Sequence, residues 1–515
     1  MIDTKALKQK ILDLAIHGKL VPQDPSDEPA SVLLEKIRAE KQRLIKEGKI
    51  KKDKNESVIY KGDDNRYYEN LPKGWVVCSI SDILFVRTGA TFNKDDSTTQ
   101  RKENYIRVLR GGNISYYSTI FKNDDLYIPL EIVNENILVK QYDIITPAVT
   151  SLENIGKMSC IDFTLEERVT VGGFVYLLSP ILYDNTFAKY IVYQLTSEYY
   201  INQLRRIAKK SGAAFYNINK TKLNSLPFFM PPYEEQKRIV EYIEKLLTQI
   251  DSIENNQTEL KHLYDNLKNK TLDLAIRGKL VPQDPNDEPA SVLLERIRNK
   301  KKAKLGKKYV DSYIYKGDDN CYYEHIDRNL YDKVIEVPFD LPEKWAWSKV
   351  GDIAFVTKLA GFEYSDYIAP NLQKEGVPLF KGKNIQNSKI IYDFEGYIPE
   401  HISNMLSRSQ ITKKCILTPY VGSVGNIGIH NKKGKYHLGS NVGKIELLYS
   451  GIAMEEFLVY YLKSMFGYLE LTKHKKATAQ ESISIDAIRD IYIPLPPISE
   501  QQRIVDKLDE IFAKL

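Results

Sequence analysis

The chain has 515 residues, of which 43% are hydrophobic, and its formal net charge is only +6. This length predicts several domains, the apolar content argues against a disordered chain, and any nucleic-acid surface must come from local clusters of basic residues. The four cysteines lie far apart and no apolar run approaches 18 residues. We therefore expect a reduced, cytoplasmic protein without a disulfide framework, a zinc site or a membrane span.

In chain order, residues 2–16 are predicted to form a helix that ends at Gly18, and a Pro-rich loop follows. A second helix is expected to begin near Pro29, because Pro is well tolerated in the first turn. The chain then becomes basic between Lys46 and Lys54. Phosphate contact would explain this run, but a solvated helix face explains it equally well.

A globular region is predicted to begin at Leu71-Pro72-Lys73-Gly74-Trp75, and a related one at Leu341-Pro342-Glu343-Lys344-Trp345. Both regions contain short β-branched and aromatic segments separated by Gly, Asn and Asp, which is typical of strands. A helix is expected near Phe187–Ile207 in the first region and near Met454–Leu471 in the second. The two regions share landmarks and differ freely between them.

Residues 234–277 are predicted to form one long helix, because they contain no Pro or Gly and their apolar residues recur at steps of four and three. This spacing indicates a coiled-coil seam, which must be buried against a second helix. At about 1.5 Å per residue the helix is roughly 65 Å long, which suits a spacer. The predicted seam residues are Ile239, Ile243, Leu246, Ile250, Ile253, Leu260, Tyr264, Leu267 and Leu274.

Both ends of this helix recur elsewhere in the chain. The segment from Pro231 to Val240 returns in altered form from Pro496 to Val505, and residues 272–280 return as residues 12–20. The second copy is thus split between the C-terminus and the N-terminus, and only the counterparts of residues 251–260 are missing. We therefore predict a circular arrangement with adjacent termini and a pseudo-twofold axis. The predicted seam of the split copy includes Leu7, Leu14, Ile504, Leu508 and Ile511.

The linking helices are near-duplicates, whereas the globular regions differ, so the chain is predicted to do one mechanical task twice and to recognise two different things. The expected fold is α+β, with two globular domains of mixed strands and helices joined by two long antiparallel coiled-coil helices. The expected segments are a helical segment (1–45), a first recognition domain (71–232), a central coiled-coil region (233–305), a second recognition domain (338–497) and a C-terminal helix (498–515).

This pattern resembles the specificity subunit of type I restriction-modification systems. The resemblance rests on two Pro-Pro-x-x-Glu-Gln-x-x-Ile-Val segments, two Leu-Asp-Leu-Ala-Ile-x-Gly-Lys-Leu segments and two Ser-Val-Leu-Leu-Glu-x-Ile-Arg segments. The Asn113-Ile114 and Asn384-Ile385 landmarks also resemble the target-recognition domains of that family. No single motif is decisive, but their order and duplication are specific together and cover nearly the whole chain.

The resemblance implies that each globular domain reads half of a bipartite, double-stranded DNA target. It also implies that the helices set the spacing between the halves and dock two methyltransferase subunits, which methylate adenine N6. Separate restriction subunits would carry the motor and the nuclease. By the same resemblance this chain is not an enzyme and binds no cofactor, while S-adenosylmethionine, ATP and Mg belong to its partners.

Candidate DNA contacts are basic residues for phosphates, and Asn, Thr and Tyr for bases. For any one of them, an ordinary surface charge or a turn that shapes the domain is a competing explanation. In the first domain the candidates are Arg87, Lys94, Arg101, Arg107, Arg110, Asn113, Thr150, Arg205, Arg206, Lys209 and Lys210. In the second they are Tyr364, Tyr367, Lys381, Lys383, Asn384, Lys473, Lys475 and Lys476.

Enzymatic alternatives fit the sequence poorly. Met230-Pro231-Pro232-Tyr233 resembles the Asn/Asp-Pro-Pro-Tyr/Phe element of adenine methyltransferases, but Met cannot accept hydrogen bonds from the target amino group. The segment 439–445 is one residue short of a phosphate-binding loop and lacks its hydroxyl. His430 and His437 lie seven residues apart without a nearby Cys, so we predict no metal site and assign no catalytic residue.

The alternative to a DNA-recognition subunit is a two-headed protein-binding scaffold or antitoxin-like adaptor built on the same helices. Salt dependence separates it from a DNA-binding protein, because neutralising phosphates releases counterions and forces affinity to fall steeply with salt.

Overall fold

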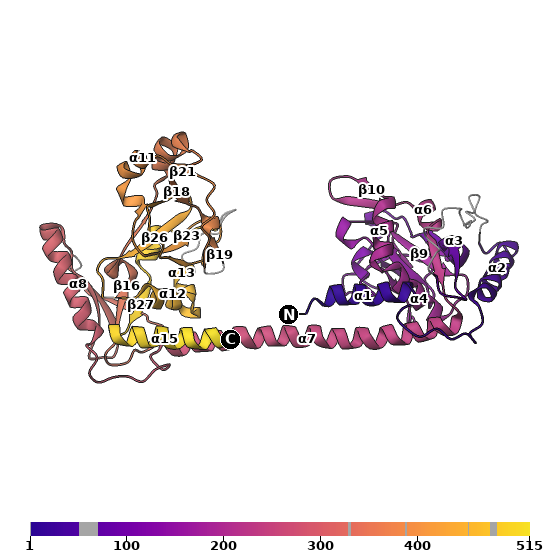
Figure 1. Ribbon diagram of the computed structural model, residues 1–515, viewed down its shortest axis with the longest axis horizontal. Coiled ribbons are helices and arrows are strands. Elements are labelled where there is room, and N and C mark those ends of the chain that lie inside the picture. The colour runs from indigo at the N-terminus through magenta and orange to yellow at the C-terminus, as the bar shows by residue number, and fades with distance from the viewer. Residues whose placement is uncertain (1, 51–70, 328–330, 387–388, 452, 474–480) are drawn as a thin grey trace. The chain divides into compact units, whose positions relative to one another are not determined.

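The computed structural model describes residues 2–50, 71–327, 331–386, 389–451, 453–473 and 481–515. The chain divides into two compact units, Met1–Thr258 and Glu259–Leu515, called unit 1 and unit 2 below. Each unit combines helices with small sheets around its own core, so the α+β prediction is confirmed (Figure 1). Among the described residues, no helix is both long and apolar enough to cross a membrane.

Unit 1 is built on a four-stranded antiparallel sheet with the strand order β2-β9-β5-β7. A second sheet has the order β4-β3-β8, in which β3 and β8 run parallel. Two smaller sheets, β10-β11-β6 and β1-β12, complete the unit. The strands are β1 (Val76–Ser79), β2 (Leu84–Thr88), β3 (Tyr105–Leu109), β4 (Leu126–Pro129), β5 (Ile144–Pro147), β6 (Val149–Thr150), β7 (Ser159–Cys160), β8 (Val169–Val171), β9 (Val175–Pro180), β10 (Ala208–Ser211), β11 (Phe215–Ile218) and β12 (Pro227–Met230).

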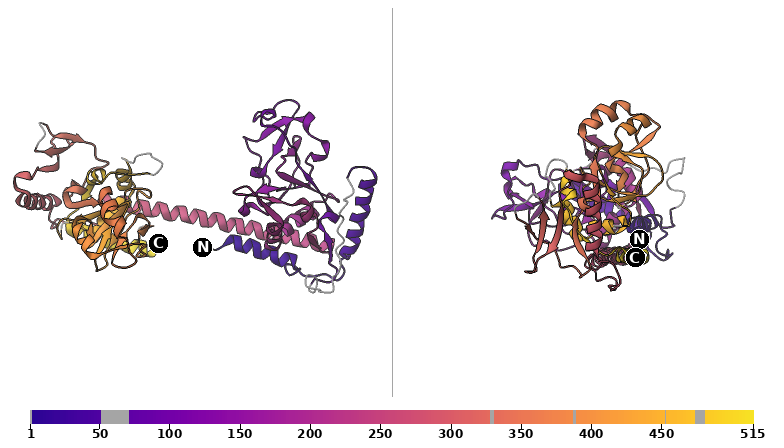
Figure 2. Two further views of the ribbon diagram at one scale, coloured as in Figure 1. Left: turned by 90° about the horizontal axis from the view of Figure 1, so that it is seen from above. Right: turned by 90° about the vertical axis from the view of Figure 1, so that its left-hand side faces the viewer.

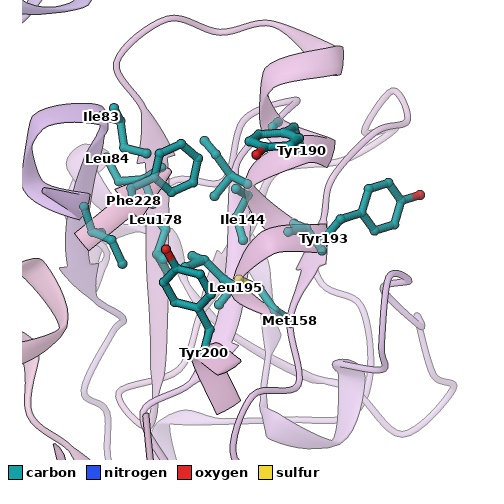
Figure 3. Packing of buried hydrophobic residues seen from close by; sticks show 14 of the residues in the cluster. Ile83, Leu84, Ile144, Met158, Leu178, Tyr190, Tyr193, Leu195, Tyr200 and Phe228 are labelled. Carbon is teal, nitrogen blue, oxygen red and sulfur yellow. The ribbon is translucent and has the colours of Figure 1, made fainter. Parts of the chain in front are cut away.

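The largest core of unit 1 lies between the four-stranded sheet and its helices, where Leu178, Tyr190 and Phe228 are almost fully buried (Figure 3). The helix expected near 187–207 is in fact two helices, because Thr196 and Ser197 interrupt it and Ser197 adopts an extended conformation. The helices of this unit are α1 (Thr4–Ile16), α2 (Ala30–Lys46), α3 (Ile80–Ile83), α4 (Asn185–Leu195), α5 (Glu198–Ile207), α6 (Lys220–Asn224) and the first part of α7 (Tyr233–Ile276).

Unit 2 repeats this plan. Its four-stranded sheet β17-β26-β23-β24 corresponds to β2-β9-β5-β7, and β16 pairs with β27 as β1 pairs with β12. A second sheet, β21-β18-β25-β22, again contains one parallel pair. These strands are β16 (Ala346–Lys349), β17 (Ala354–Lys358), β18 (Val377–Phe380), β21 (Tyr397–Ile398), β22 (Gln410–Ile411), β23 (Cys415–Pro419), β24 (Gly428–His430), β25 (Tyr436–Leu438), β26 (Val442–Leu447) and β27 (Tyr492–Leu495).

Unit 2 also carries a three-stranded sheet, β13-β14-β15, and the short pair β19-β20. The helix expected near 454–471 is again two helices, here separated at Ser464, whose hydroxyl caps the second one by accepting from the Gly467 N–H at 3.2 Å. The remaining elements are α8 (Ala290–Leu305), α9 (Val350–Ile353), α10 (Gly361–Glu363), α11 (Glu400–Met405), α12 (Glu455–Lys463), α13 (Met465–Thr472), α14 (Ile485–Arg489), α15 (Ile498–Lys514), β13 (Ser312–Lys316), β14 (Tyr322–Ile326), β15 (Lys333–Ile335), β19 (Ile385–Gln386) and β20 (Lys389–Ile390).

The long helix predicted over 234–277 is confirmed as α7. In unit 1, α1 lies along its first part (Figures 1 and 2). The Lys8 ammonium bonds Asp251 at 2.9 Å and Glu254 at 3.2 Å, and the Ile2 N–H donates to Gln257 at 2.8 Å. Partner numbers rise as α1 numbers fall, so the two helices are antiparallel.

In unit 2, α15 lies along the last part of α7 and is again antiparallel to it (Figure 1). Leu272 and Ala275 of α7 share one buried cluster with Ile504 and Leu508 of α15. The Lys268 ammonium lies 5.9 Å from the centre of the Phe512 ring. Each unit therefore contains one half of the long helix paired with one half of its split copy.

The predicted seam is buried only in part. Ile239, Ile243, Ile250, Ile504 and Leu508 are buried; Leu14, Leu246, Ile253, Leu274 and Ile511 are half-buried. The prediction fails at Leu260 and Leu267, which are 66% and 49% exposed, and Leu7 and Tyr264 are also exposed. The circular arrangement with adjacent termini stays a prediction.

Candidate DNA-binding surface

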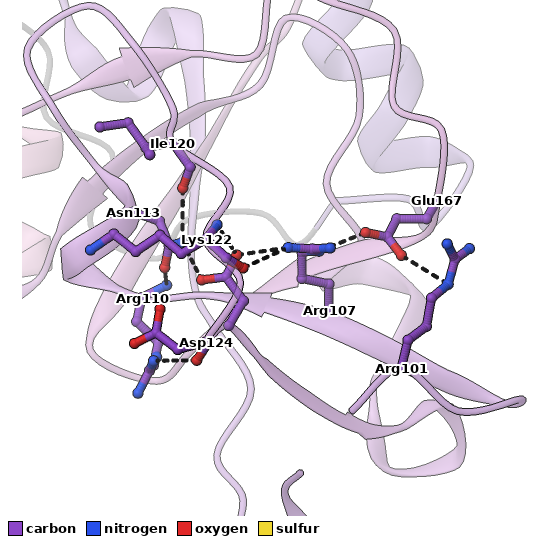
Figure 4. A network of polar contacts seen from close by, with 9 residues as sticks. Arg101, Arg107, Arg110, Asn113, Ile120, Lys122, Asp124 and Glu167 are labelled. Atoms are coloured by element: carbon purple, nitrogen blue, oxygen red, sulfur yellow. Dashed lines mark hydrogen bonds and ion pairs between the residues drawn. The ribbon is translucent and has the colours of Figure 1, made fainter. Parts of the chain in front are cut away.

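The Asn113 landmark is a turn that closes on its own side chain (Figure 4). The Asn113 carboxamide accepts from the Arg110 N–H at 2.8 Å and donates to the Ile120 carbonyl at 2.9 Å and to Asp125 at 2.5 Å. The residue is 1% exposed. Because these bonds occupy the side chain and bury it, we assign Asn113 to the turn and correct its prediction as a base reader.

Asn384 occupies the same position in unit 2. Its carboxamide accepts from the Lys381 N–H at 2.9 Å and donates to the carbonyls of Ile391 and Asp393 at 2.9 and 2.8 Å. It too is 1% exposed, so the same correction applies. Sequence spacing identified the shared landmark, but the choice between contact and turn depended on which side chains packed around it.

Arg107 belongs to an internal ion-pair network and not to an open surface (Figure 4). Its guanidinium lies 2.9 Å from Asp125 and 2.6 Å from Glu167, and the side chain is only 16% exposed. Burial alone would lower the pKa of Arg107, but the bonds to Asp125 and Glu167 outweigh burial and raise the pKa above its ordinary value. Two carboxylates already neutralise this cation, which leaves it a weak candidate for phosphate contact.

The other candidates in the first part of unit 1 differ in exposure and in the bonds that their side chains already make. Arg87 is half-buried and donates to the Asn136 carbonyl and the Ser179 hydroxyl. Arg101 is 71% exposed and lies 3.5 Å from Glu167. Lys94 and Arg110 are exposed, and Arg110 makes a long 3.4 Å bond to the Asp124 carbonyl. The structure therefore leaves Lys94, Arg101 and Arg110 available at the surface.

The strongest basic cluster of unit 1 lies on one short segment. Arg205 and Arg206 lie in the last turn of α5, and Lys209 and Lys210 lie on β10, the first strand of the hairpin β10–β11 (Figure 1). All four side chains are exposed. Within the described part of the chain, none of these four cations has an ion-pair partner. The structure thus brings together the four basic residues that the sequence placed close in number.

Two exposed aromatic residues that the sequence did not reveal lie in this hairpin and beside its sheet. Phe215, the first residue of β11, is 56% exposed beside the basic strand β10. Phe174 is 73% exposed, and its carbonyl accepts from the Ala148 N–H at 2.8 Å, next to β6 of the same sheet. An aromatic residue at the tip of a basic hairpin was the missed signal. Thr150, predicted to contact DNA bases, is instead buried in β6 opposite Tyr216, so we correct its prediction as a base reader.

In unit 2 the candidates are more dispersed. Tyr364 and Tyr367 pack partly against a buried cluster and are only half-exposed. Lys381 and Lys383 both lie near Glu395. Lys473 is exposed and lies 2.6 Å from Glu470. Lys475 and Lys476 lie outside the described residues.

Comparison with known proteins identifies the family to which the two globular regions are similar. Residues 72–262 and 342–515 match the family model described as the type I restriction modification DNA specificity domain. The chain is 27% identical to the EcoAI specificity subunit of Escherichia coli, over 98% of this chain and 88% of that protein. It is 26% identical to the EcoEI specificity subunit of Escherichia coli, over 99% and 89%.

A more distant relative is the MjaVIII specificity subunit of Methanocaldococcus jannaschii, at 22% identity over 86% of this chain and 87% of that protein. A solved structure from a study of complex assembly and conformational transition of the type I R-M system shares the fold, with a TM-score of 0.54 and 16% identity. It covers 86% of this chain and 91% of that chain. The family model, which matches both globular regions, shows that this chain belongs to the type I restriction-modification specificity family, whose members are non-catalytic DNA-recognition subunits.

Proposed function

We propose that units 1 and 2 each read one half of a bipartite double-stranded DNA target, and that unit 1 does so through the segment 205–215. The observation that carries this proposal is the exposed, unneutralised set Arg205, Arg206, Lys209 and Lys210 beside exposed Phe215. Basic side chains without internal carboxylates are suited to phosphates, which supply most of the affinity and fix the register on the duplex.

Specificity requires contacts with base edges or with a deformed base step. An arginine suits guanine O6 and N7, and an exposed phenylalanine suits a wedge or stacking contact. We therefore infer that Arg205 or Arg206 contributes base readout in unit 1, while the two lysines contact phosphates. In unit 2 Lys383 and Lys473 are exposed, but each already pairs with a carboxylate, Glu395 and Glu470 respectively, so we assign no single residue to phosphate contact there.

The same proposal gives α7 the role of a spacer. The helix has 44 residues without interruption, and its length changes only by whole inserted residues at about 1.5 Å each. We infer that α7 and its split copy set the separation of the half-sites and dock two methyltransferase subunits. Those subunits would bind S-adenosylmethionine and methylate adenine N6, and separate restriction subunits would use ATP and Mg.

We also propose functional segments for the chain. The helical parts, 1–45, 233–305 and 498–515, would serve spacing and assembly. The parts 71–232 and 338–497 would serve recognition. Support comes from the contrast between the near-identical helical repeats and the divergent globular regions.

The decisive experiment exchanges residues 71–230 for the corresponding domain of another family member. Methylated adenines are then mapped across a genome that expresses the reconstituted complex. We expect one half-site to change while the other half-site and the spacing are kept. A change in both half-sites would overturn the assignment of one half-site to each unit.

A point test addresses the hairpin. Lys209→Ala should weaken DNA binding of the reconstituted complex on all sequences and reduce the slope of log affinity against log salt by about 1. Lys245→Ala is the matched control, because Lys245 is an exposed lysine of α7 outside the globular domain. Equal slopes for the two variants would remove Lys209 from the proposed surface.

A further inference from the structure

A cavity of about 260 Å³ lies inside unit 2, lined by residues of α8, β13, β16 and α9. Leu294, Ile297 and Ile314 form part of its apolar wall. Its volume is many times the roughly 10–15 Å³ that a single water requires, and it lies just below the roughly 300–1,000 Å³ of sites for drug-sized ligands. The cavity therefore has room for a small organic molecule.

An unpaired hydrogen-bond donor belongs to the wall of this cavity. Trp347 of β16 lines the cavity and is 2% exposed, and within the described residues its indole N–H has no acceptor. The indole N–H groups of Trp75 and Trp345 instead donate to Glu235 and Glu500 at 2.9 and 3.0 Å. Because a buried donor without a partner costs stability, an acceptor that enters the cavity and reaches the Trp347 N–H is favoured.

Two cations of α8, Arg298 and Lys301, line the same cavity. The Arg298 guanidinium lies 4.5 Å from the centre of the Tyr313 ring, its Nε is buried without an acceptor, and it forms no ion pair among the described residues. The Lys301 ammonium donates to the Gly351 carbonyl at 3.3 Å and lies 4.0 Å from the Asp352 carboxylate. Burial lowers the pKa of Lys301, so Asp352 offsets only part of the cost of burying this cation.

The charges around the cavity are not balanced. Asp352 is the one carboxylate among the lining residues, against two cations. Glu324, which lies near Asp352, already pairs with Lys349. Asp311 accepts from the Tyr309 hydroxyl at 2.8 Å. One excess positive charge beside an unpaired N–H favours an oxyanion over water, because a charged acceptor forms the stronger hydrogen bonds.

The counterpart of this region in unit 1 lacks two of these features. Val77 stands at the position of Trp347 and offers no donor. The counterpart of Arg298 is Arg38, whose guanidinium lies 3.5 Å from the Asp82 carboxylate. An arginine without an ion pair beside an unpaired indole N–H is therefore particular to unit 2.

We propose that the cavity in unit 2 binds a small organic anion, whose carboxylate or phosphate group accepts hydrogen bonds from Arg298, Lys301 and Trp347. The apolar part of the anion packs against Ile297 and Ile314. Because the cavity lies where α8 meets β16, the bound anion links the repeated helical segment to the second globular region (Figure 1). This site is separate from the DNA-binding surface proposed for unit 1 and does not depend on it.

The proposal is tested on the full chain by NMR of the indole N–H groups, with benzoate and phenyl phosphate as probes and neutral benzamide as the control of similar size. The chain has three tryptophans, and the variants Trp75→Phe and Trp345→Phe assign the Trp347 signal by elimination. We expect both anions, or one of them, to move the Trp347 signal downfield and to saturate the shift at about 10 mM or less. The other two indole signals should stay in place, because their donors are already bonded.

The source of the anion is read from the two probes. A shift with benzoate alone identifies a carboxylate ligand, a shift with phenyl phosphate alone identifies a phosphate ligand, and a shift with both shows that the site reads the shared oxyanion. No saturable shift with either anion, or an equal shift with benzamide, would overturn the proposal.

The cation is tested with Arg298→Gln, which keeps a polar side chain and removes the charge. We expect it to weaken binding of the anion about tenfold or more, since a charge-assisted bond is lost. Arg296→Gln is the matched control on the same helix, because Arg296 is 56% exposed and pairs with Glu288 outside the cavity. The unmoved Trp75 and Trp345 signals report that each variant is folded. Equal affinity in the two variants would show that Arg298 does not hold the anion.

Discussion

The two units join helix, loop and globular domain in the same way. In unit 1 the buried Glu235 carboxylate accepts from the Trp75 indole N–H at 2.9 Å and from Gln23. In unit 2 Glu500 accepts from the Trp345 indole N–H at 3.0 Å and from Gln283. Beside each carboxylate an arginine of the long or split helix lies 2.6 Å from a loop aspartate: Arg238 from Asp27, and Arg503 from Asp287.

Away from these junctions the units diverge. Unit 1 has a basic hairpin with an aromatic tip, and Lys8 is satisfied by two carboxylates. In unit 2 Lys268 and Lys463 lack such partners among the described residues. At each junction several side chains bury one another, so a change in one residue disturbs the others. Exposed surfaces carry no such constraint on their residues.

The largest effect is expected where the junction meets the core. Ile239→Asp and Ile504→Asp each place a carboxylate at a position that is 0% exposed. Burial of an unpaired charge should lower the free energy of unfolding by about 3 kcal/mol or more in either unit. Urea unfolding followed by tryptophan fluorescence checks this. If only one of the two variants lost unfolding free energy, the two junctions would not be equivalent.

A smaller effect is expected from Trp75→Phe and Trp345→Phe. Each removes the indole N–H and leaves a buried carboxylate with one fewer donor, which costs about 1–3 kcal/mol. Calorimetry on both variants compares the units directly. Tyr127→Phe is a useful control, because no hydrogen bond of the Tyr127 hydroxyl is present within the described residues. A cost no larger than that of the control would show that the indole bond is unimportant.

Both junction carboxylates should make stability depend on pH. Burial raises the pKa of Glu235 and of Glu500 above the ordinary value, against the opposing effect of their hydrogen bonds. A raised carboxyl pKa favours the protonated folded form, so this contribution is present at low pH and is lost as pH rises through the raised pKa. Glu235→Gln and Glu500→Gln should therefore become more stabilising relative to the native chain as pH rises from 4 upward.

The measurement is the difference in free energy of unfolding between variant and native chain across that pH range. Both variants should show the same sign, since the two carboxylates have matching donors. A difference that stays flat with pH in both variants would contradict the raised pKa.

The smallest effect concerns Lys8 and Lys268, which hold the same position in the repeated segments 4–16 and 264–276. Lys8→Ala removes a partly exposed ion pair and should cost under about 1 kcal/mol, because solvent screens such pairs. Lys268→Ala removes no pair within the described residues and should cost less. Thermal unfolding at low and high salt checks both. Equal, salt-sensitive losses would show that Lys268 already has a partner.

Sequence alone determined the helices and their duplication. The 4-3 spacing of Ile239, Ile243 and Ile250 and the absence of Pro and Gly specify α7, because helical hydrogen bonds are local and the apolar period reports them directly. Gly18 was predicted to end its helix because glycine tolerates a left-handed conformation, and Gly278 is its counterpart in the repeat 272–280. Both have positive φ, of 62° and 65°, and an added Cβ would meet Pro72 and Pro342 at 2.3 and 2.5 Å.

Only the tertiary structure decided the roles of the polar residues and the breaks in the shorter helices. By residue type, Asn113 and Arg107 were predicted to contact DNA. In the structure the Asn113 side chain is bonded within its own turn, and Arg107 pairs with Asp125 and Glu167. Ser197 and Ser464 divide helices whose periodicity continues through them. Burial and partner choice depend on residues far apart in the chain, so local pattern could not reveal that Leu260 and Leu267 would be exposed while Ile239, Ile243 and Ile250 were buried.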